Sequence, residues 1–330
     1  MGGDNAPESN VAGAVKALRF YDDLNLILVG KNDIIEKNLN NVDYNYRDKI
    51  KIENASQVID MEALPSKAVR KKKKSSIYIG TSLVKKNQAD AFISAGNTGA
   101  VMGASLLNIG RISGIKRPSI AAVFPSVSGK TLVMDAGANV DSKPLNLLQF
   151  SIMGQIYYEK IIGENNPKLG LLSIGEEKKK GNQLTLETYE LLENDDRIKN
   201  FCGNVEGRDI FQETSDIIVC DGFTGNVVLK TSEGAIFYLM DLIKNTLKQN
   251  FYTKAVSYLL KPYFRKIKNK IDYRHYGGAP LLGINGVVII SHGSSDALAI
   301  TNAIKVAQDT VKKRVVDLIE DKINKAGGSE

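Results

Sequence analysis

Cysteine, histidine and long apolar runs are all scarce in this sequence, and each scarcity excludes a class of protein. The two cysteines, Cys202 and Cys220, lie in apolar strand-like runs without C-x-x-C spacing, so we expect buried, reduced thiols and a cytoplasmic protein. With His275 and His292 as the only histidines, no cluster has metal-ligand spacing, and we expect neither a metal site nor a cofactor. Because no signal peptide and no apolar run of about 18 residues is found, we expect no membrane-spanning helix.

The composition is that of an ordinary globular protein with a positive charge. The chain has 330 residues, of which 43% are hydrophobic and 25% charged, and the excess of Lys and Arg gives a net charge of +7. This excess gathers in three runs, Arg70–Lys74, Lys178–Lys180 and Lys261–Arg274. Such runs favour nucleic acid, an anionic membrane or an acidic protein, or are merely solvated. No base-reading module accompanies them, so we predict no nucleic-acid partner.

Alternating strand and helix patterns predict the fold class. Buried runs such as Leu24–Gly30 and Ala89–Ala95 are each followed by helical spacing, which is typical of an α/β fold with a mostly parallel sheet. Ser119–Phe124 and Lys130–Met134 read as an antiparallel hairpin, so the sheet is mixed. A chain of this length is expected to form two lobes with a cleft between them. We expect residues 1–110 plus 286–330 in the first lobe, and 111–285 in the second, with a basic helical hairpin near 240–276.

The most informative stretch of the sequence is a short strand followed by a glycine turn and a helix. Ile217–Cys220 is a short buried strand, and Asp221–Asn226 is a glycine turn that opens an apolar helical pattern. A strand that ends in glycines and begins a helix directs backbone N–H groups and the positive helix end at its ligand, which suits an anion. A plain strand-to-helix turn remains the alternative.

Three further loops also lie at the end of a predicted strand. Gly96-Asn97-Thr98-Gly99 follows a strand and opens a helix, although its spacing matches no nucleotide-binding motif. Ser291–Asp296 is another polar glycine turn, and Gly175–Asn182 carries three lysines at a strand end, which either meet an anionic substrate or are solvated.

The segment Tyr252–Tyr276 is basic and amphipathic. Its apolar residues recur at steps of three and four and are flanked by lysines, which describes a helix on an anionic membrane surface or one packed in a subunit interface. We expect Pro262 to kink or split it. The apolar residues are Val256, Leu259, Leu260, Tyr263, Phe264, Ile267 and Ile271.

Taken together, these motifs resemble the bacterial phosphate acyltransferases of phospholipid synthesis from end to end. The matching segments are Met1–Pro7, Ser94–Ala100, Ile174–Glu177 with Lys180–Asn182, Asp221–Asn226 and His292–Ser295. The family's first motif normally follows a short strand, which is not part of this sequence, so either the start is misplaced or a sheet strand is missing. The resemblance implies two interlocked three-layer α/β/α lobes, similar to the isocitrate/isopropylmalate dehydrogenase and phosphotransacetylase group, and a homodimer.

The resemblance also implies the reaction and its site. The family moves a fatty acyl group from acyl-acyl carrier protein to inorganic phosphate, giving acyl phosphate for phosphatidic acid. Its catalytic lysine and asparagine fall on Lys180 and Asn226. By position, we expect substrate contacts at Gly96, Asn97, Thr98, Gly99, Gly222, Thr224 and Gly225. The family's peripheral membrane association implies membrane contact at Leu259, Leu260, Tyr263 and Phe264.

The chemistry of this reaction agrees with the scarcity of histidine in the sequence. Phosphate is already an anionic nucleophile and a thiolate is a tolerable leaving group, so cations and fixed dipoles suffice to hold phosphate and to stabilise the oxyanion. The alternatives are a phosphotransacetylase-type enzyme using acyl-CoA, a metal- and NAD-dependent dehydrogenase, and a non-catalytic scaffold on the membrane surface. The dehydrogenase would need a carboxylate cluster, which we do not find in the sequence.

Overall fold

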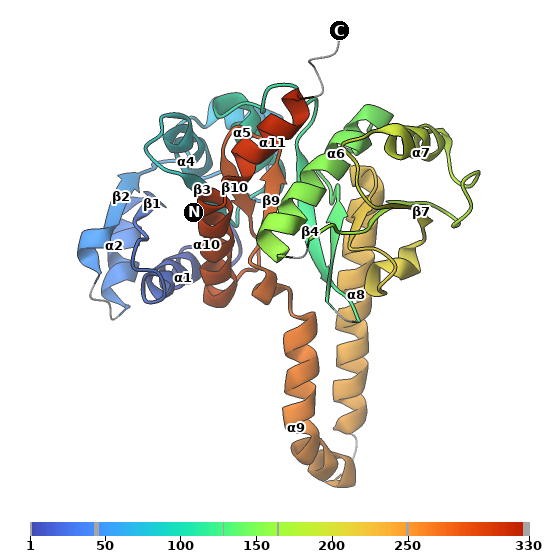
Figure 1. Ribbon diagram of the computed structural model, residues 1–330. Coiled ribbons are helices and arrows are strands. Elements are labelled where there is room, and N and C mark those ends of the chain that lie inside the picture. Colours follow the sequence, from blue (N-terminus) through green and yellow to red (C-terminus); the bar gives the residue numbers. More distant parts are fainter. Residues whose placement is uncertain (1, 43–45, 128, 164, 249–250, 326–330) are drawn as a thin grey trace.

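A computed structural model describes residues 2–325 apart from 43–45, 128, 164 and 249–250. Most of the chain forms a body of strands covered by helices, and two long helices project from it as a hairpin (Figure 1). The strands are β1 Leu26–Gly30, β2 Ile50–Asn54, β3 Ala91–Ser94, β4 Ser119–Pro125, β5 Lys130–Met134, β6 Leu169–Leu172, β7 Phe201–Val205, β8 Ile217–Val219, β9 Ala279–Leu282 and β10 Val287–Ile290.

Helices separate most of these strands. They are α1 Glu8–Leu18, α2 Asn32–Asn40, α3 Pro65–Lys71, α4 Ser76–Lys85, α5 Thr98–Asn108, α6 Pro144–Tyr157, α7 Gln183–Asn194, α8 Gly222–Leu247, α9 Phe251–Ile271, α10 Ala297–Lys312 and α11 Val315–Asn324. Short helical turns are η1 Arg47–Lys49, η2 Tyr158–Ile162, η3 Gly207–Phe211 and η4 Tyr273–Tyr276.

Eight strands form one mixed sheet in the order β3-β10-β9-β4-β5-β8-β6-β7. The pairs β3/β10, β5/β8, β8/β6 and β6/β7 are parallel, whereas β9 and β4 are antiparallel to their neighbours on both sides. The predicted α/β class and the predicted β4–β5 hairpin are therefore confirmed. The division into two lobes stays a prediction, since the sheet is continuous across it.

Alternate residues of the central strands face opposite helical layers. Leu132 and Met134 of β5 pack with α6 and α11, while Val133 belongs to a second core that includes α5. β8 repeats this division, with Ile217 and Val219 on one face and Ile218 on the other. Because both faces are buried, the strand reads as a continuous apolar run, and the result is a three-layer arrangement.

A second, two-stranded parallel sheet of β1 and β2 lies beside the large one. Within the described residues, β1 pairs only with β2, and β3 pairs only with β10. A cavity of about 500 Å³ separates the two sheets and is lined by Leu26–Val29 on one side and Ala91–Ala95 on the other. Gly2, the first described residue, also lines it.

Two local expectations are corrected. The apolar pattern after Asp296 predicts one long helix, but the chain breaks between α10 and α11, where Arg314 has a φ of +52°. The break lets Ala303 and Ala307 pack on β10, while Val315 and Ile319 pack on the α6 side. Both cysteines are free as expected, yet Cys202 is exposed rather than buried.

The predicted basic hairpin is formed by α8 and α9, which leave the body side by side (Figure 1). Pro262 lies inside α9, which is not split into two helices, although it changes direction along its length. In the described parts of the chain, no helix combines the length and apolar character needed to cross a bilayer.

Candidate active site

Two glycines allow the β8–α8 turn to pack tightly. Asp221 begins α8 by accepting hydrogen bonds from the Thr224 backbone N–H at 2.9 Å and the Thr224 hydroxyl at 2.7 Å. A Cβ at Gly222 would lie 2.4 Å from the carbonyl oxygen of Asn139, and one at Gly225 would lie 1.9 Å from that of Asp135. Both positions therefore require glycine because of close backbone approach.

The backbone N–H groups of this turn are already engaged. That of Gly222 donates to the Asn139 carbonyl at 2.8 Å, and that of Gly225 donates to the Asp221 carbonyl at 3.0 Å. Thr224 donates to Asp221 as described above. A helix cap and the neighbouring loop take these three N–H groups, and substrate contact at Gly222, Thr224 and Gly225 stays a prediction.

A buried carboxylate that the sequence analysis does not single out holds the turn in place. Asp135, fully buried after β5, accepts backbone hydrogen bonds from Ile120, Ala138 and Asn139 at 2.8–3.0 Å. The Asn139 side chain adds a fourth at 2.7 Å. Burial raises the pKa of Asp135, and these four hydrogen bonds oppose the rise. Asp135 thereby fixes the loop against which the glycines of α8 pack.

The structure places Asn226 and Lys180 at the same edge of the sheet. β8 leads into α8, which carries Asn226 in its first turns, and the parallel neighbour β6 leads into the loop that carries Lys180. Neighbouring strands lie about 4.8 Å apart, so these two turns adjoin. Asn226 lies against Gly137 of the β5 loop and, with the cap at Asp221, is not a helix cap.

The three lysines of the β6 loop differ in their partners. Lys178 forms ion pairs with Glu190 at 3.1 Å and Glu193 at 2.5 Å, and these carboxylates raise its pKa. Lys180 is exposed, and no ion pair is found for it among the described residues. Its backbone carbonyl accepts from the Ser173 hydroxyl at 3.0 Å, which anchors the loop to the end of β6. Of this run, Lys178 is therefore engaged by two carboxylates, whereas the charge of Lys180 is available to a substrate.

The Gly96–Gly99 turn lies elsewhere. The side chain of Asn97 caps α5 through the Ala100 N–H at 2.9 Å, and its amide donates to the Met61 carbonyl at 2.7 Å and the Ala63 carbonyl at 3.2 Å. Asn97 is thus a buried brace, while Thr98 is exposed.

Strand direction separates this turn from Lys180 and Asn226. β10 is antiparallel to β9, β9 to β4 and β4 to β5, so β3 and β10 run opposite to β5, β8 and β6. The turns after β3 and β8 leave opposite edges and are five strand spacings apart, or roughly 24 Å. The two turns therefore lie far apart within the described chain, and substrate contact at Gly96, Asn97, Thr98 and Gly99 stays a prediction.

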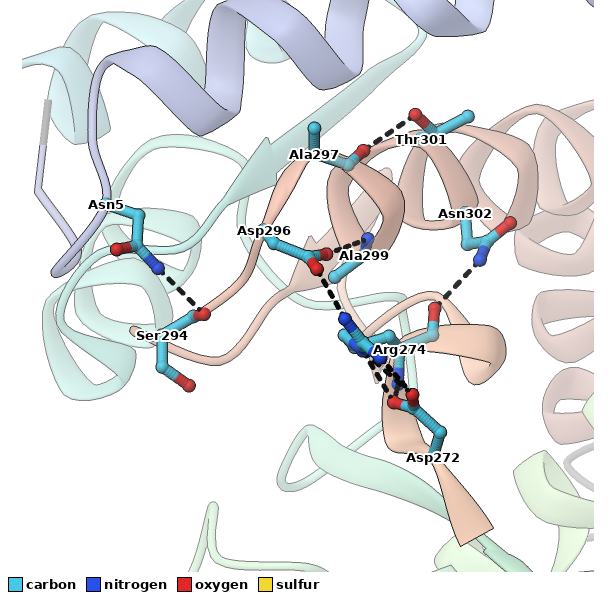
Figure 2. Close-up of polar contacts among 9 residues, drawn as sticks. All are labelled: Asn5, Asp272, Arg274, Ser294, Asp296, Ala297, Ala299, Thr301 and Asn302. Atoms are coloured by element: carbon cyan, nitrogen blue, oxygen red, sulfur yellow. Dashed lines mark hydrogen bonds and ion pairs between the residues drawn. The ribbon is translucent and has the colours of Figure 1, made fainter. Parts of the chain in front are cut away.

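An ion-pair cluster fastens the end of the hairpin to the body (Figure 2). Arg274 of η4 binds the buried carboxylate of Asp272 and reaches Asp296 at 2.6 Å, which in turn caps α10 through the Ala299 N–H at 3.0 Å. Asn302 donates to the Arg274 carbonyl at 2.8 Å. Asn5 contacts the Ser294 carbonyl at 3.0 Å, so the amino-terminal loop and the β10 turn join this cluster, which we call the clasp. No pattern in the sequence predicts it.

The residues predicted to touch a membrane lie on the projecting hairpin. Leu259 and Tyr263 are strongly exposed, Leu260 less so, and Phe264 is half-buried.

Within the described residues, no group of three His, Cys, Asp or Glu side chains is placed so that it could hold a metal ion.

Comparison with known proteins establishes the family. Residues 1–318 match the family model described as fatty acid synthesis protein. A phosphate acyltransferase from Halothermothrix orenii is 60% identical over 99% of this chain and 98% of its own length. One from Clostridioides difficile is 47% identical over 98% of this chain and 95% of its own length. The chain belongs to the phosphate acyltransferase family. It is accordingly a transferase of fatty acid and phospholipid synthesis.

Solved structures show the same fold at low identity. A phosphotransacetylase from Streptococcus pyogenes aligns with a TM-score of 0.63 and 17% identity over 93% of this chain and 92% of its own. A branched-chain phosphotransacylase from Enterococcus faecalis aligns with a TM-score of 0.57 and 16% identity over 94% of this chain and 96% of its own. The α/β fold of this phosphate acyltransferase family member is therefore shared with enzymes that transfer acyl groups.

Proposed function

We propose that the protein transfers a fatty acyl group from acyl-acyl carrier protein to inorganic phosphate, releasing acyl phosphate for phospholipid synthesis. The observation that carries this proposal is the placement of Lys180 and Asn226. Both are exposed on adjoining turns at the carboxyl ends of β6 and β8, and the relatives named phosphate acyltransferase supply the reaction class.

The reaction is an addition followed by an elimination. A phosphate oxygen attacks the thioester carbonyl carbon, the carbonyl oxygen becomes an oxyanion, and the C–S bond then breaks as the thiolate leaves. Lys180 stabilises the negative charge of phosphate and of the intermediate, and the Asn226 amide donates to one of these oxygens. Holding the two reactants together lowers the barrier further, since it removes the entropic cost of their encounter.

The partners follow from charge and exposure. Acyl carrier protein is acidic, and the positive net charge of this chain supports salt-dependent docking. Exposed apolar residues on both hairpin helices, such as Phe237 and Leu239 on α8 and Leu259 and Tyr263 on α9, support a homodimer and contact with an anionic membrane surface. We propose a cytoplasmic protein that associates peripherally with the membrane.

Acyl phosphate formation from palmitoyl-acyl carrier protein and phosphate tests the proposal. We expect Lys180→Ala to lower kcat/KM about 100-fold, as loss of one oxyanion or phosphate contact does. Lys179→Ala is the matched control, an exposed neighbour that should retain activity. Absence of turnover in the wild type, or equal losses in both variants, would contradict the proposal.

A second candidate donor is acyl-CoA. The specific observation in its favour is the fold shared with phosphotransacetylases. Palmitoyl-CoA run beside the carrier thioester in the same assay distinguishes them, because a preference for CoA would assign the protein to the phosphotransacetylase reaction.

A further inference from the structure

Four apolar side chains lie exposed on the turns that carry or border Lys180 and Asn226. They are Val140, 69% exposed, Ile174, 80%, Phe223, 61%, and Val227, 47%. Single exposed apolar residues are ordinary, but several on adjoining turns form a patch that indicates a binding site. We call these four residues the apolar rim.

Hydrogen bonds and strand register place the four residues of the apolar rim on adjoining turns. The Gly222 N–H donates to the Asn139 carbonyl at 2.8 Å, which places the next residues of both segments, Phe223 and Val140, beside each other. Val227 follows Phe223 by four positions on α8, so the two share one helix face. Leu171 of β6 is in register with Val219 of β8, so Ile174 and Gly222 leave the two strands at the same level.

The surroundings of the apolar rim are polar and charged. Lys180 and Glu177 both approach Gly175, the residue after Ile174: a Cβ built at that glycine would lie 3.1 Å from the Lys180 Cγ and 3.0 Å from a Glu177 carboxylate oxygen. Asn226 lies between Phe223 and Val227 in the helix and contacts Gly137. Lys143 is also exposed near this edge. An apolar surface bordered by a cation and a carboxamide fits an amphiphile whose reactive carbonyl lies at the polar end of an aliphatic chain.

We infer that the apolar rim binds the acyl chain of the thioester donor next to its carbonyl, and that Phe223 and Ile174 determine the chain-length preference. The inference rests on the proposed function, since it names the residues that bind the acyl donor of that reaction. A second copy of the chain is a poorer occupant, because covering these residues would also cover Lys180 and Asn226 and exclude the substrate from them.

Kinetics across acyl-chain lengths test the inference. Octanoyl and palmitoyl carrier thioesters are compared in the wild type and in Phe223→Ser and Ile174→Ser. We expect KM for the palmitoyl donor to rise about tenfold, as loss of apolar contacts in a pocket does, and KM for the octanoyl donor to change less. The control is Phe20→Ser, which removes a similarly exposed phenylalanine side chain, 64% against 61%, just after α1. It should leave both values unchanged.

A binding measurement separates this inference from the proposed reaction. The chain contains no tryptophan, so Phe223→Trp gives a single emission signal, which we expect to shift to shorter wavelength with palmitoyl donor in the absence of phosphate. Absence of turnover together with this shift would contradict the reaction but not the acyl site. Equal changes for both chain lengths, no shift, or a loss of dimer in Phe223→Ser without a kinetic change would overturn the inference.

Discussion

Two glycines of helix α8 should respond to alanine in opposite ways. A methyl group at Gly225 would lie 1.9 Å from the Asp135 carbonyl oxygen, so Gly225→Ala must displace backbone and should destabilise the fold by about 3 kcal/mol. Gly234 has nothing within 4 Å of its Cβ position, and Gly234→Ala should stabilise by about 1 kcal/mol through helix propensity. Urea unfolding of both variants checks this: unchanged stability of Gly225→Ala would contradict the packing role of Gly225, and a loss of stability in Gly234→Ala would contradict the gain from helix propensity.

Asn226 should be sensitive to a change that preserves its shape. Asn226→Asp replaces the two amide donors by a charged acceptor, which repels phosphate and cannot stabilise an oxyanion, so kcat/KM for acyl phosphate formation should fall at least about 100-fold. Asn245→Asp on the same helix is the control, since its amide contacts only Asp241 among the residues described. Similar activity in the two variants would remove Asn226 from the proposed mechanism.

The clasp belongs to the scale of elements, because it joins η4 to α10. Burial would raise the pKa of Asp296, but hydrogen bonds from the Ala299 N–H and from Arg274 outweigh this and lower it. A carboxyl group whose pKa is lower in the folded state stabilises the fold above its unfolded pKa, and that contribution is lost as the pH falls below about 4.

We therefore expect Arg274→Gln to lower Tm near pH 7 by several degrees and to weaken the dependence of Tm on pH below about 4. Lys230→Gln, which breaks an exposed ion pair with Glu233 on α8, should change little and serves as the control. Thermal unfolding between neutral and acidic pH measures both variants. An unchanged pH profile in Arg274→Gln would show that the clasp does not hold η4 to α10.

The hairpin is the other element with its own prediction. Leu259→Asp puts a negative charge on a strongly exposed position of α9, so binding to anionic lipid vesicles should fall about tenfold or more while turnover of the carrier thioester without vesicles persists. Vesicle co-sedimentation measures this, with Glu233→Gln, on the part of α8 near the body, as the control. Equal vesicle binding by Leu259→Asp and the wild type would locate the membrane contact elsewhere or remove it.

At the same scale, the sequence predicts elements better than their ends. The run Ile217–Val219 is apolar because both of its faces are buried, so its strand is evident, as is the β4–β5 hairpin. The break at Arg314 is not evident, since α10 and α11 continue one apolar pattern while packing on different partners. The structural role of Asp135 is also not evident from the sequence, because Ile120, one of its hydrogen-bond partners, lies fifteen residues away in the chain.

At the scale of the molecule, strand order and direction determine which turns lie at the same edge of the sheet, and the sequence does not show them. The turns after β3 and β8 have the same local pattern, a strand followed by glycines and a helix, and nothing local reveals the direction in which each strand runs. The antiparallel strands β9 and β4 reverse that direction between them. Lys180 and Asn226 adjoin because β6 and β8 are parallel neighbours, which is also a property of the whole sheet.

The two-stranded sheet has a consequence for local opening. Among the described residues β1 and β2 pair only with each other, and of the residues in these two strands only Gly30 is buried. Segments with few buried contacts open without unfolding the rest of the protein. We therefore expect backbone amides of Leu26–Gly30 to exchange with deuterium through a local opening, at least about 100-fold faster than those of Ile217–Val219, whose exchange requires the whole sheet to come apart.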